Sequence, residues 1–259
     1  MPFLPEILSA PGASPRGMLA VPERLVPSWT PLDDPDIYAD FPVSTLDLGA
    51  GSWADNAGNV APLTQTSAGN RGTISGTLGG KDLLVFNGST TWWNANSLAY
   101  GTPSDWTIFA VFVLPNQAAS TGIAEQLFNS RAPERLRITP RFSGGVDSLN
   151  VESYGTVTNN YLVNNETPGG ALWVVWSLGS TPAIYRNGVS QPFTGPAAWT
   201  PQVMGSSNVL GAQSNGAGTG TAGQFFKGDL AEIAFFTRAF SAADVAGDLA
   251  GYVSREYGL

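Results

Sequence analysis

The segment at 90–96, which reads TTWWNAN, holds the residue types that a sugar-binding site needs. A tryptophan offers a flat apolar face on which a sugar ring stacks, and asparagine amides offer donors and acceptors for its hydroxyls. Side chains alternate along an extended segment, so Trp92 and Trp93 are expected on opposite faces, with at most one of them free. The segment predicts either core packing for both tryptophans or a contact of one of them with a glycan or a protein partner.

Residues of the same chemical kind occur elsewhere in the chain. Tyr100 follows this segment, and Trp199 stands in an Ala- and Pro-rich stretch. The Asn-rich stretch at 156–165 is expected to line the rim of the same binding site. The predicted ligand-binding set is Trp92, Trp93, Asn94, Asn96, Tyr100 and Trp199.

The carboxylates do not show the spacing of a hydrolase. A retaining glycoside hydrolase needs two carboxylates about 5 Å apart, which residues i and i+2 of one strand can supply. Glu232 has no acid two or four residues further on, and Glu152 has none nearby. We therefore predict a structural role for Glu232, either in pairing with Arg238 or in capping backbone donors.

The absence of histidine and cysteine removes the Ser-His-Asp triad, the usual general base and any thiolate nucleophile. We predict that the protein is not an enzyme, and we assign no catalytic residue.

Two aspartates are candidates for calcium ligands, namely Asp55 and Asp229, with a purely structural turn as the alternative for Asp55. Calcium takes about six to eight oxygen ligands, several of them charged. The chain has no dense run such as D-x-D-x-D-G. We predict no cofactor and no other metal site, and we keep calcium as the alternative.

Several segments have strong strand or turn signals, and the elements that they predict would position these residues. The stretches at 106–114 (WTIFAVFVL) and 172–178 (LWVVWSL) are almost wholly apolar, as in strands covered on both faces. Asn187-Gly188 between two short β-like runs predicts a hairpin with a type I′ turn. Ser241 and Asp244 have the spacing of a capping box, so a helix is expected to follow.

Composition fits an all-β protein with neutral loops. Only 12% of the residues are charged, and the chain contains 31 glycines and 19 prolines. A net charge of −8 without a basic run argues against nucleic acid, and no apolar run approaches the roughly 18 residues of a membrane span. The missing cysteines favour assembly in a reducing cytoplasm. The first residues lack a basic region, so no signal peptide is expected.

Residues 1–45 differ from the rest of the chain and predict an extended anchoring arm. Nine of the 19 prolines lie within residues 1–46, a density that excludes regular helix or central strand. The arm also carries apolar residues that need a surface to lie on: Phe3, Leu4, Ile7, Leu8, Leu25, Trp29 and Tyr38. It is expected either to wrap its own domain or to dock onto neighbouring subunits.

Short motifs spread over residues 46–259 resemble those of laminin-G-like, concanavalin-A-like jelly rolls. GDLAE at 228–232 and TRAFS at 237–241 resemble the closing "G-D-I-A-E" strand and "N-R-A-L-S" corner of that family, with Thr237 in place of Asn. WADNAGN at 53–59 resembles its opening "W-x-D-x-S-G-N" turn, and LLVFNGS at 83–89 its next strand and turn. The resemblance implies an antiparallel jelly-roll sandwich of two sheets, with a short C-terminal helix. Relatives of this kind often bind calcium, and some are glycoside hydrolases.

Arm and sandwich together suggest a structural or adhesion protein of a phage or phage-like particle. Residues 1–46 would contact other particle proteins in a homo- or hetero-oligomeric assembly, and the jelly roll would meet a host-surface glycan. The expected location is the particle surface, at the tail, the baseplate or the capsid, after assembly in the host cytoplasm. The alternatives are a stand-alone carbohydrate-binding module and a hydrolase or lyase of the same fold.

Overall fold

The structure is a computed structural model that describes residues 29–99, 104–114, 127–131, 135–143, 146–154, 159–166, 170–198, 207–214 and 220–259. Several residues named above lie outside these ranges, namely Phe3, Leu4, Ile7, Leu8, Leu25, Tyr100 and Trp199.

One sheet of the sandwich has eight antiparallel strands in the order β15-β14-β13-β8-β19-β6-β5, and β1 also pairs with β19. Strands β8 and β13 coincide with the two apolar stretches, and nearly every residue in them is buried. This confirms that both are covered on two faces. The strands are β1 (Ile37–Pro42), β5 (Thr73–Leu78), β6 (Lys81–Asn87), β8 (Trp106–Leu114), β13 (Gly170–Leu178), β14 (Ala183–Arg186), β15 (Val189–Ser190) and β19 (Lys227–Phe236).

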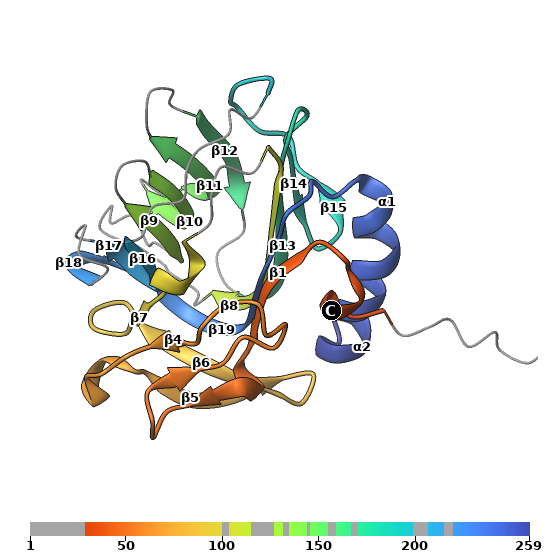
Figure 1. The fold of residues 1–259 in the computed structure, drawn as a ribbon. Coiled ribbons are helices and arrows are strands. Elements are labelled where there is room, and N and C mark those ends of the chain that lie inside the picture. The colour runs from red at the N-terminus through yellow and green to blue at the C-terminus, as the bar shows by residue number, and fades with distance from the viewer. Residues whose placement is uncertain are drawn as a thin grey trace, which may run out of the picture.

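The second sheet has nine antiparallel strands in the order β12-β11-β10-β9-β16-β7-β4-β3-β2. They are β2 (Leu46–Asp47), β3 (Ser52–Trp53), β4 (Leu63–Thr64), β7 (Trp93–Asn94), β9 (Phe128–Arg131), β10 (Arg135–Ser143), β11 (Val146–Tyr154), β12 (Asn159–Glu166) and β16 (Ser207–Leu210). A separate hairpin pairs β17 (Ala212–Ser214) with β18 (Gly220–Phe225). The predicted all-β, two-sheet jelly-roll sandwich is confirmed (Figure 1).

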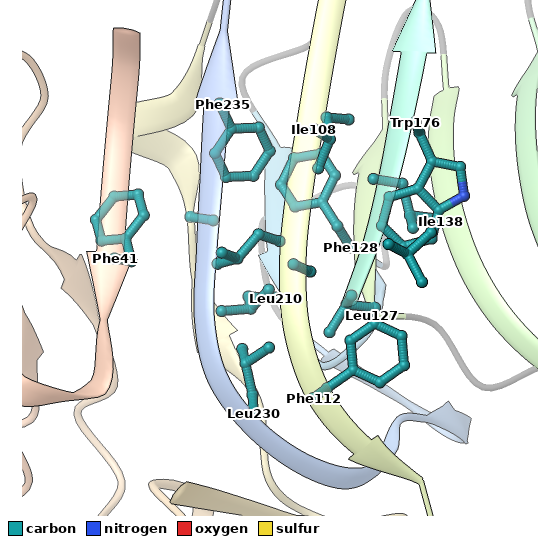
Figure 2. Close-up of a cluster of buried hydrophobic side chains, with 14 of the residues drawn as sticks. Phe41, Ile108, Phe112, Leu127, Phe128, Ile138, Trp176, Leu210, Leu230 and Phe235 are labelled. Carbon is teal, nitrogen blue, oxygen red and sulfur yellow. The ribbon is translucent and has the colours of Figure 1, made fainter. Parts of the chain in front are cut away.

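The main core lies between the two sheets and is rich in aromatic side chains (Figure 2). Phe235 of β19 and Trp176 of β13 come from one sheet, and Phe128 of β9 comes from the other. Phe128 and Phe235 meet edge to face with ring centroids 5.3 Å apart. Burying each large apolar side chain stabilises the fold by roughly 2–3 kcal/mol, so this layer holds the sheets together.

A second cluster covers the outer face of the eight-stranded sheet and receives the C-terminal helical segment (Figure 1). That segment comprises α1 (Ala242–Asp244), one turn of π-helix (Val245–Leu249) and α2 (Ala250–Tyr257). The predicted capping box is present, because Ser241 Oγ accepts the Asp244 N–H while the Asp244 carboxylate accepts the Ser241 N–H. The short C-terminal helix is thereby confirmed.

The hairpin turn has the backbone geometry that its sequence predicts. Asn187 has φ 48° and Gly188 has φ 78°, which are the positive values that a type I′ turn requires. The turn joins β14 to β15 at the edge of the eight-stranded sheet.

Residues 29–45 belong to the sandwich, although the sequence analysis assigns them to the arm. Strand β1 pairs with β19, and its Phe41 is fully buried. Trp29 meets Tyr252 of α2 edge to face at 6.2 Å, and Tyr38 packs against the main core. The arm boundary at residue 45 is therefore corrected: the sandwich begins at least as early as Trp29, and these two aromatic residues pack on their own domain.

Candidate functional site

The two adjacent tryptophans lie on opposite sides of their segment. Trp93 is 0% exposed and packs edge to face against Trp53 with ring centroids 5.9 Å apart. Trp92 is half-buried. Trp93 is thus corrected from a ligand-contacting residue to a core residue, because no ligand reaches a fully buried side chain, and Trp92 is left to offer its ring.

The asparagines beside Trp92 use their carbonyl oxygens to shape the local backbone. Asn94 Oδ1 accepts the Asn96 N–H at 2.9 Å, and Asn96 Oδ1 accepts the Asn208 N–H at 2.8 Å. Both side chains are half-buried. Within the described residues their amide nitrogens make no hydrogen bond, so each retains N–H groups that can donate to a ligand hydroxyl.

Asn94 belongs to a row of residues in register across seven strands of the nine-stranded sheet, which we call the polar row. Each neighbouring pair in the row is a cross-strand pair of the ladder. From β4 to β12 the row consists of Thr64, Asn94, Val209, Asn129, Arg137, Glu152 and Asn160.

Thr64 and Asn94 of the polar row lie on the outer face of this sheet, away from the core. Its strand neighbours Trp93, Phe128, Ile138 and Val151 are all buried in the main core, and successive residues of a strand take opposite faces. Val209 is 0% exposed, so the chain itself covers the centre of the row at β16. The polar side chains of Thr64 on β4 and Asn94 on β7 remain to one side of it.

Asp55 acts as a turn former whose carboxylate caps four backbone N–H groups. It accepts from Asp40 at 2.8 Å, Ala57 at 3.0 Å, Asn59 at 2.7 Å and Val60 at 3.0 Å. These bonds employ both oxygens and tie the turn to β1. The arrangement matches the structural alternative that the sequence analysis offered for Asp55.

The second calcium candidate, Asp229, lies elsewhere, half-buried on β19 opposite Val85 and Val113. Burial raises the pKa of its carboxyl. Within the described part of the chain, no group of three or more acidic, histidine or cysteine residues gathers that could hold a metal ion.

The structure brings together two buried carboxyls that the sequence analysis did not pair, Asp40 of β1 and Glu232 of β19. Asp40 is 2% exposed and lines a cavity of about 360 Å³, whereas Glu232 is 0% exposed. The Glu232 carboxylate accepts the hydroxyls of Tyr252, at 2.7 Å, and Tyr257. This cluster pins helix α2 to the eight-stranded sheet.

The buried carboxyls of Asp40 and Glu232 influence each other's protonation. Asp40 Oδ1 and Glu232 Oε1 are buried and have no hydrogen-bond partner, and the charge of Asp40 acts on Glu232. Burial, opposed in part by the hydrogen bond from Asn56, raises the pKa of Asp40 to about 6. Burial and the neighbouring Asp40 charge also raise the pKa of Glu232 well above its usual range. One carboxyl of the pair therefore stays protonated under conditions in which an exposed one would be ionised.

Glu232 does not pair with Arg238, which was one of its two predicted roles. Arg238 pairs instead with Asp34, whose oxygen lies 2.6 Å from a guanidinium nitrogen, and with Asp244 at 3.1 Å. The predicted structural role of Glu232 is fulfilled by its two tyrosine partners.

Sequence reasoning missed both the polar row and the carboxyl pair, for different reasons. Asp40 and Glu232 stand far apart in the chain and meet only because β1 pairs with β19, so no local signal reveals them. The row left a trace in RLRITPRFS at 135–143, where arginines alternate with apolar residues. That alternation is typical of a strand with one polar face.

Neither the comparison with protein-family models nor that with curated proteins finds a match for this sequence. Among solved structures, domain 4 of AbnA, a GH43 extracellular arabinanase from Geobacillus stearothermophilus solved in complex with arabinotriose, is similar. It is 17% identical with a TM-score of 0.50, over 83% of this chain and 98% of its own. The binding domain of Paraclostridial Mosquitocidal Protein 1 is 12% identical with a TM-score of 0.61. That alignment covers 84% of this chain and 52% of the other, so this chain matches about half of it.

These similarities define the class of fold, an antiparallel β-sandwich shared with domains that occur beside or within larger proteins. Within the described residues, no helix is long and apolar enough to cross a membrane.

Proposed function

We propose that this chain is a non-catalytic recognition protein that binds a carbohydrate on the outer face of its nine-stranded sheet, beside Trp92. The observation that carries the proposal is that one short segment holds a half-buried tryptophan, Trp92, and two half-buried asparagines, Asn94 and Asn96, with free amide N–H groups. An aromatic face beside polar donors is the combination that sugar recognition uses. The arabinotriose bound by the structurally similar arabinanase domain lends support.

The absence of catalysis is part of the proposal. Asp40 and Glu232 form a pair of neighbouring carboxyls, and both are almost inaccessible to solvent. A general acid must come within hydrogen-bond reach of the proton it transfers in a bound substrate. Glu232 is buried under two tyrosines, so we assign the pair to stability.

A glycan array with the full chain tests the proposal, followed by titration of each hit with Trp92→Ala. We expect at least one glycan to bind, and the variant to lose affinity by about tenfold or more, the usual loss for a truncated aromatic anchor. Trp29→Ala is the matched control, because Trp29 is also half-buried but packs on helix α2. An array without hits overturns the proposed function, and equal losses for the two variants overturn the site.

We further propose that residues 1–28 anchor the protein to a phage or phage-like particle, where the sandwich acts as an adhesion or decoration module. The proline-rich, apolar composition of this segment supports an anchoring role. The test is co-sedimentation of the chain with its parent particles. We expect the full chain to sediment with them and a chain that lacks residues 1–28 to stay in the supernatant. Equal incorporation of both chains would rule out the anchor.

A further inference from the structure

The segment that contains β7 places Trp92 and two asparagines on one face of the nine-stranded sheet. Burial alternates along this segment, and the buried residues, each at most 1% exposed, are Thr91, Trp93 and Ala95. The residues between and directly after them are half-buried. Because successive residues of an extended segment take opposite faces, Trp92, Asn94 and Asn96 share the outer face of the sheet.

Strands β4 and β3 extend the same face with hydroxyl groups. Buried and exposed side chains alternate over residues 63–66, and the exposed ones are Thr64 and Thr66. Thr64 lies in register with Asn94 on one side and with Ser52 of β3 on the other. Residues directly opposite each other in a ladder point to the same face of the sheet. We call the six residues of this face the uncharged patch: Ser52, Thr64, Thr66, Trp92, Asn94 and Asn96.

The loop that follows β4 holds the backbone of Trp92 from two sides. The Trp92 N–H donates to the carbonyl oxygen of Asn70 at 3.1 Å, and the Trp92 carbonyl oxygen accepts from Gln65 Nε2 at 2.7 Å. Gln65 is 2% exposed, and its Oε1 accepts the Ser67 N–H at 3.0 Å, so its amide is fixed at both ends. A segment that is already ordered loses less conformational entropy when a ligand binds.

Two charged residues border the uncharged patch, and both are engaged by backbone groups. Asp47 of β2 lies in register with Ser52, and its Oδ1 accepts the Ala50 N–H at 2.9 Å. Arg71 donates at distances from 2.7 to 3.3 Å to the carbonyl oxygens of Leu48, Gly49, Gln65 and Thr66. Its guanidinium therefore has no pair of N–H groups left for a carboxylate, and an acidic ligand would be repelled by Asp47.

We propose that the uncharged patch binds a neutral oligosaccharide, with a sugar ring on Trp92 and sugar hydroxyls on the amides and hydroxyls around it. Within the described residues, the side-chain hydroxyls of Ser52, Thr64 and Thr66 make no hydrogen bond. Asn94 and Asn96 keep amide N–H groups free. A sugar hydroxyl both donates and accepts, as these groups together do. This ligand class rests on the proposed carbohydrate-binding function and makes it more specific.

The width of the uncharged patch favours an oligosaccharide over a single sugar. Ser52 and Asn94 are two strands apart, which is about 10 Å at ~4.8 Å per strand. The next residue of the row, Val209 of β16, is 0% exposed, so the patch ends at β7 on that side. A ligand that contacts all three strands must therefore extend from Trp92 and Asn94 toward β3.

The experiment compares neutral and acidic glycans as ligands of the full chain by calorimetry. The set consists of any hits of the glycan array, the neutral polymers arabinan, galactan, glucomannan and dextran, and the acidic polymers polygalacturonate and alginate. We expect the tightest ligand to be neutral. Its affinity should change less than about twofold between about 50 mM and about 300 mM salt, because counter-ions screen only charged contacts.

A matched pair of threonine variants tests the uncharged patch itself. Thr64→Val removes one hydroxyl and keeps the shape of the side chain, and it is expected to weaken the tightest ligand about threefold to tenfold, the effect of one hydrogen bond. Thr73→Val makes the same change at an exposed threonine of β5, in the other sheet, and should bind as the natural chain does.

The outcomes separate the neutral ligand from the proposed function. A tightest ligand that is acidic, or an affinity that falls several-fold with salt, would overturn the neutral ligand and leave carbohydrate recognition standing. If no glycan binds, both fail. Equal affinities of Thr64→Val and Thr73→Val would show that the ligand does not use the uncharged patch. Circular dichroism shows whether the variants are folded, and Thr66→Val replaces Thr64→Val if that variant is not.

Discussion

At the scale of single residues, the buried pair of Asp40 and Glu232 shows how the sandwich uses carboxyls without exposing them. Asp40 is held by the amide of Asn56 at 3.0 Å and its backbone N–H by Asp55, while Glu232 is held by two tyrosine hydroxyls. Each carboxyl has one buried oxygen without a hydrogen-bond partner, and we infer that a proton shared by the pair offsets this cost. Removing that proton leaves like charges in a site of low dielectric, which is costly.

This pair makes stability depend on pH in a defined direction. The folded-state pKa of Asp40 is raised to about 6, above its usual 3.8, so between these values the folded protein holds a proton that the unfolded chain has released. The free energy of unfolding must then fall as pH rises through that window. We expect urea unfolding to give about 1 kcal/mol more stability at pH 5 than at pH 7. A stability that is equal at both values, or lower at pH 5, would contradict the shared proton.

Replacing Asp40 by asparagine should supply the missing donor permanently. The amide oxygen of Asp40→Asn can still accept from Asn56, and its N–H can donate to Glu232. We expect the variant to be at least as stable as the natural chain at pH 7 and to lose the difference between pH 5 and pH 7. Asp33→Asn, an exposed acid of the turn before β1, is the control and should keep that difference.

At the scale of elements, the corner after β19 ties three parts of the chain together through Arg238. Its guanidinium bonds both oxygens of Asp34, which is 3% exposed, and reaches Asp244 in the first turn of α1. It also lies 4.2 Å from the centre of the Phe240 ring. The corner thus joins the segment before β1 to the C-terminal helix.

Removing this guanidinium should be costly, because Asp34 would keep a buried charge without a partner. We expect Arg238→Ala to lower the free energy of unfolding by about 2–4 kcal/mol, the range for a broken pair that is largely buried. Arg255→Ala removes an exposed arginine of α2 and should cost less than about 1 kcal/mol. Urea unfolding of both variants at pH 7 measures the difference, and equal costs would refute the role of the corner.

Elements with strong local signals were predictable from the sequence. The apolar runs of β8 and β13, the Asn187-Gly188 turn and the Ser241 capping box all match the structure, because each is decided by neighbouring residues. Strand β1 was not foreseen, since its prolines argue against a strand. It forms because Ala39 and Phe41 fit the core beside β19, so tertiary packing outweighs local preference.

The candidate site was predictable only in part. Alternation indicated that at most one of the two adjacent tryptophans would be free, but which one depended on the contact between Trp93 and Trp53 across the sheet. The polar row unites Asn94 with Arg137 through two intervening strands. Register between distant strands is set by turns and core packing together, so the sequence of either strand alone does not contain it.

At the scale of the whole molecule, the two outer faces of the sandwich have different roles. The C-terminal helix covers the outer face of the eight-stranded sheet with apolar contacts (Figure 1). The nine-stranded sheet has Thr64 and Asn94 on its own outer face. The proposed recognition site and the contact of Trp29 with Tyr252 therefore belong to different sides of the sandwich.

This division predicts that two truncations differ sharply. The described residues, from Trp29 onward, already form two extensive core clusters, so we expect a chain that lacks residues 1–28 to unfold cooperatively with a free energy within about 1 kcal/mol of the full chain. Removal of residues 1–45 also deletes β1, and losing Phe41 alone should cost about 3–5 kcal/mol. We expect that shorter chain to aggregate or to show no cooperative transition in urea. If it folded as well as the longer one, β1 would be dispensable, and the sandwich would begin at residue 46 after all.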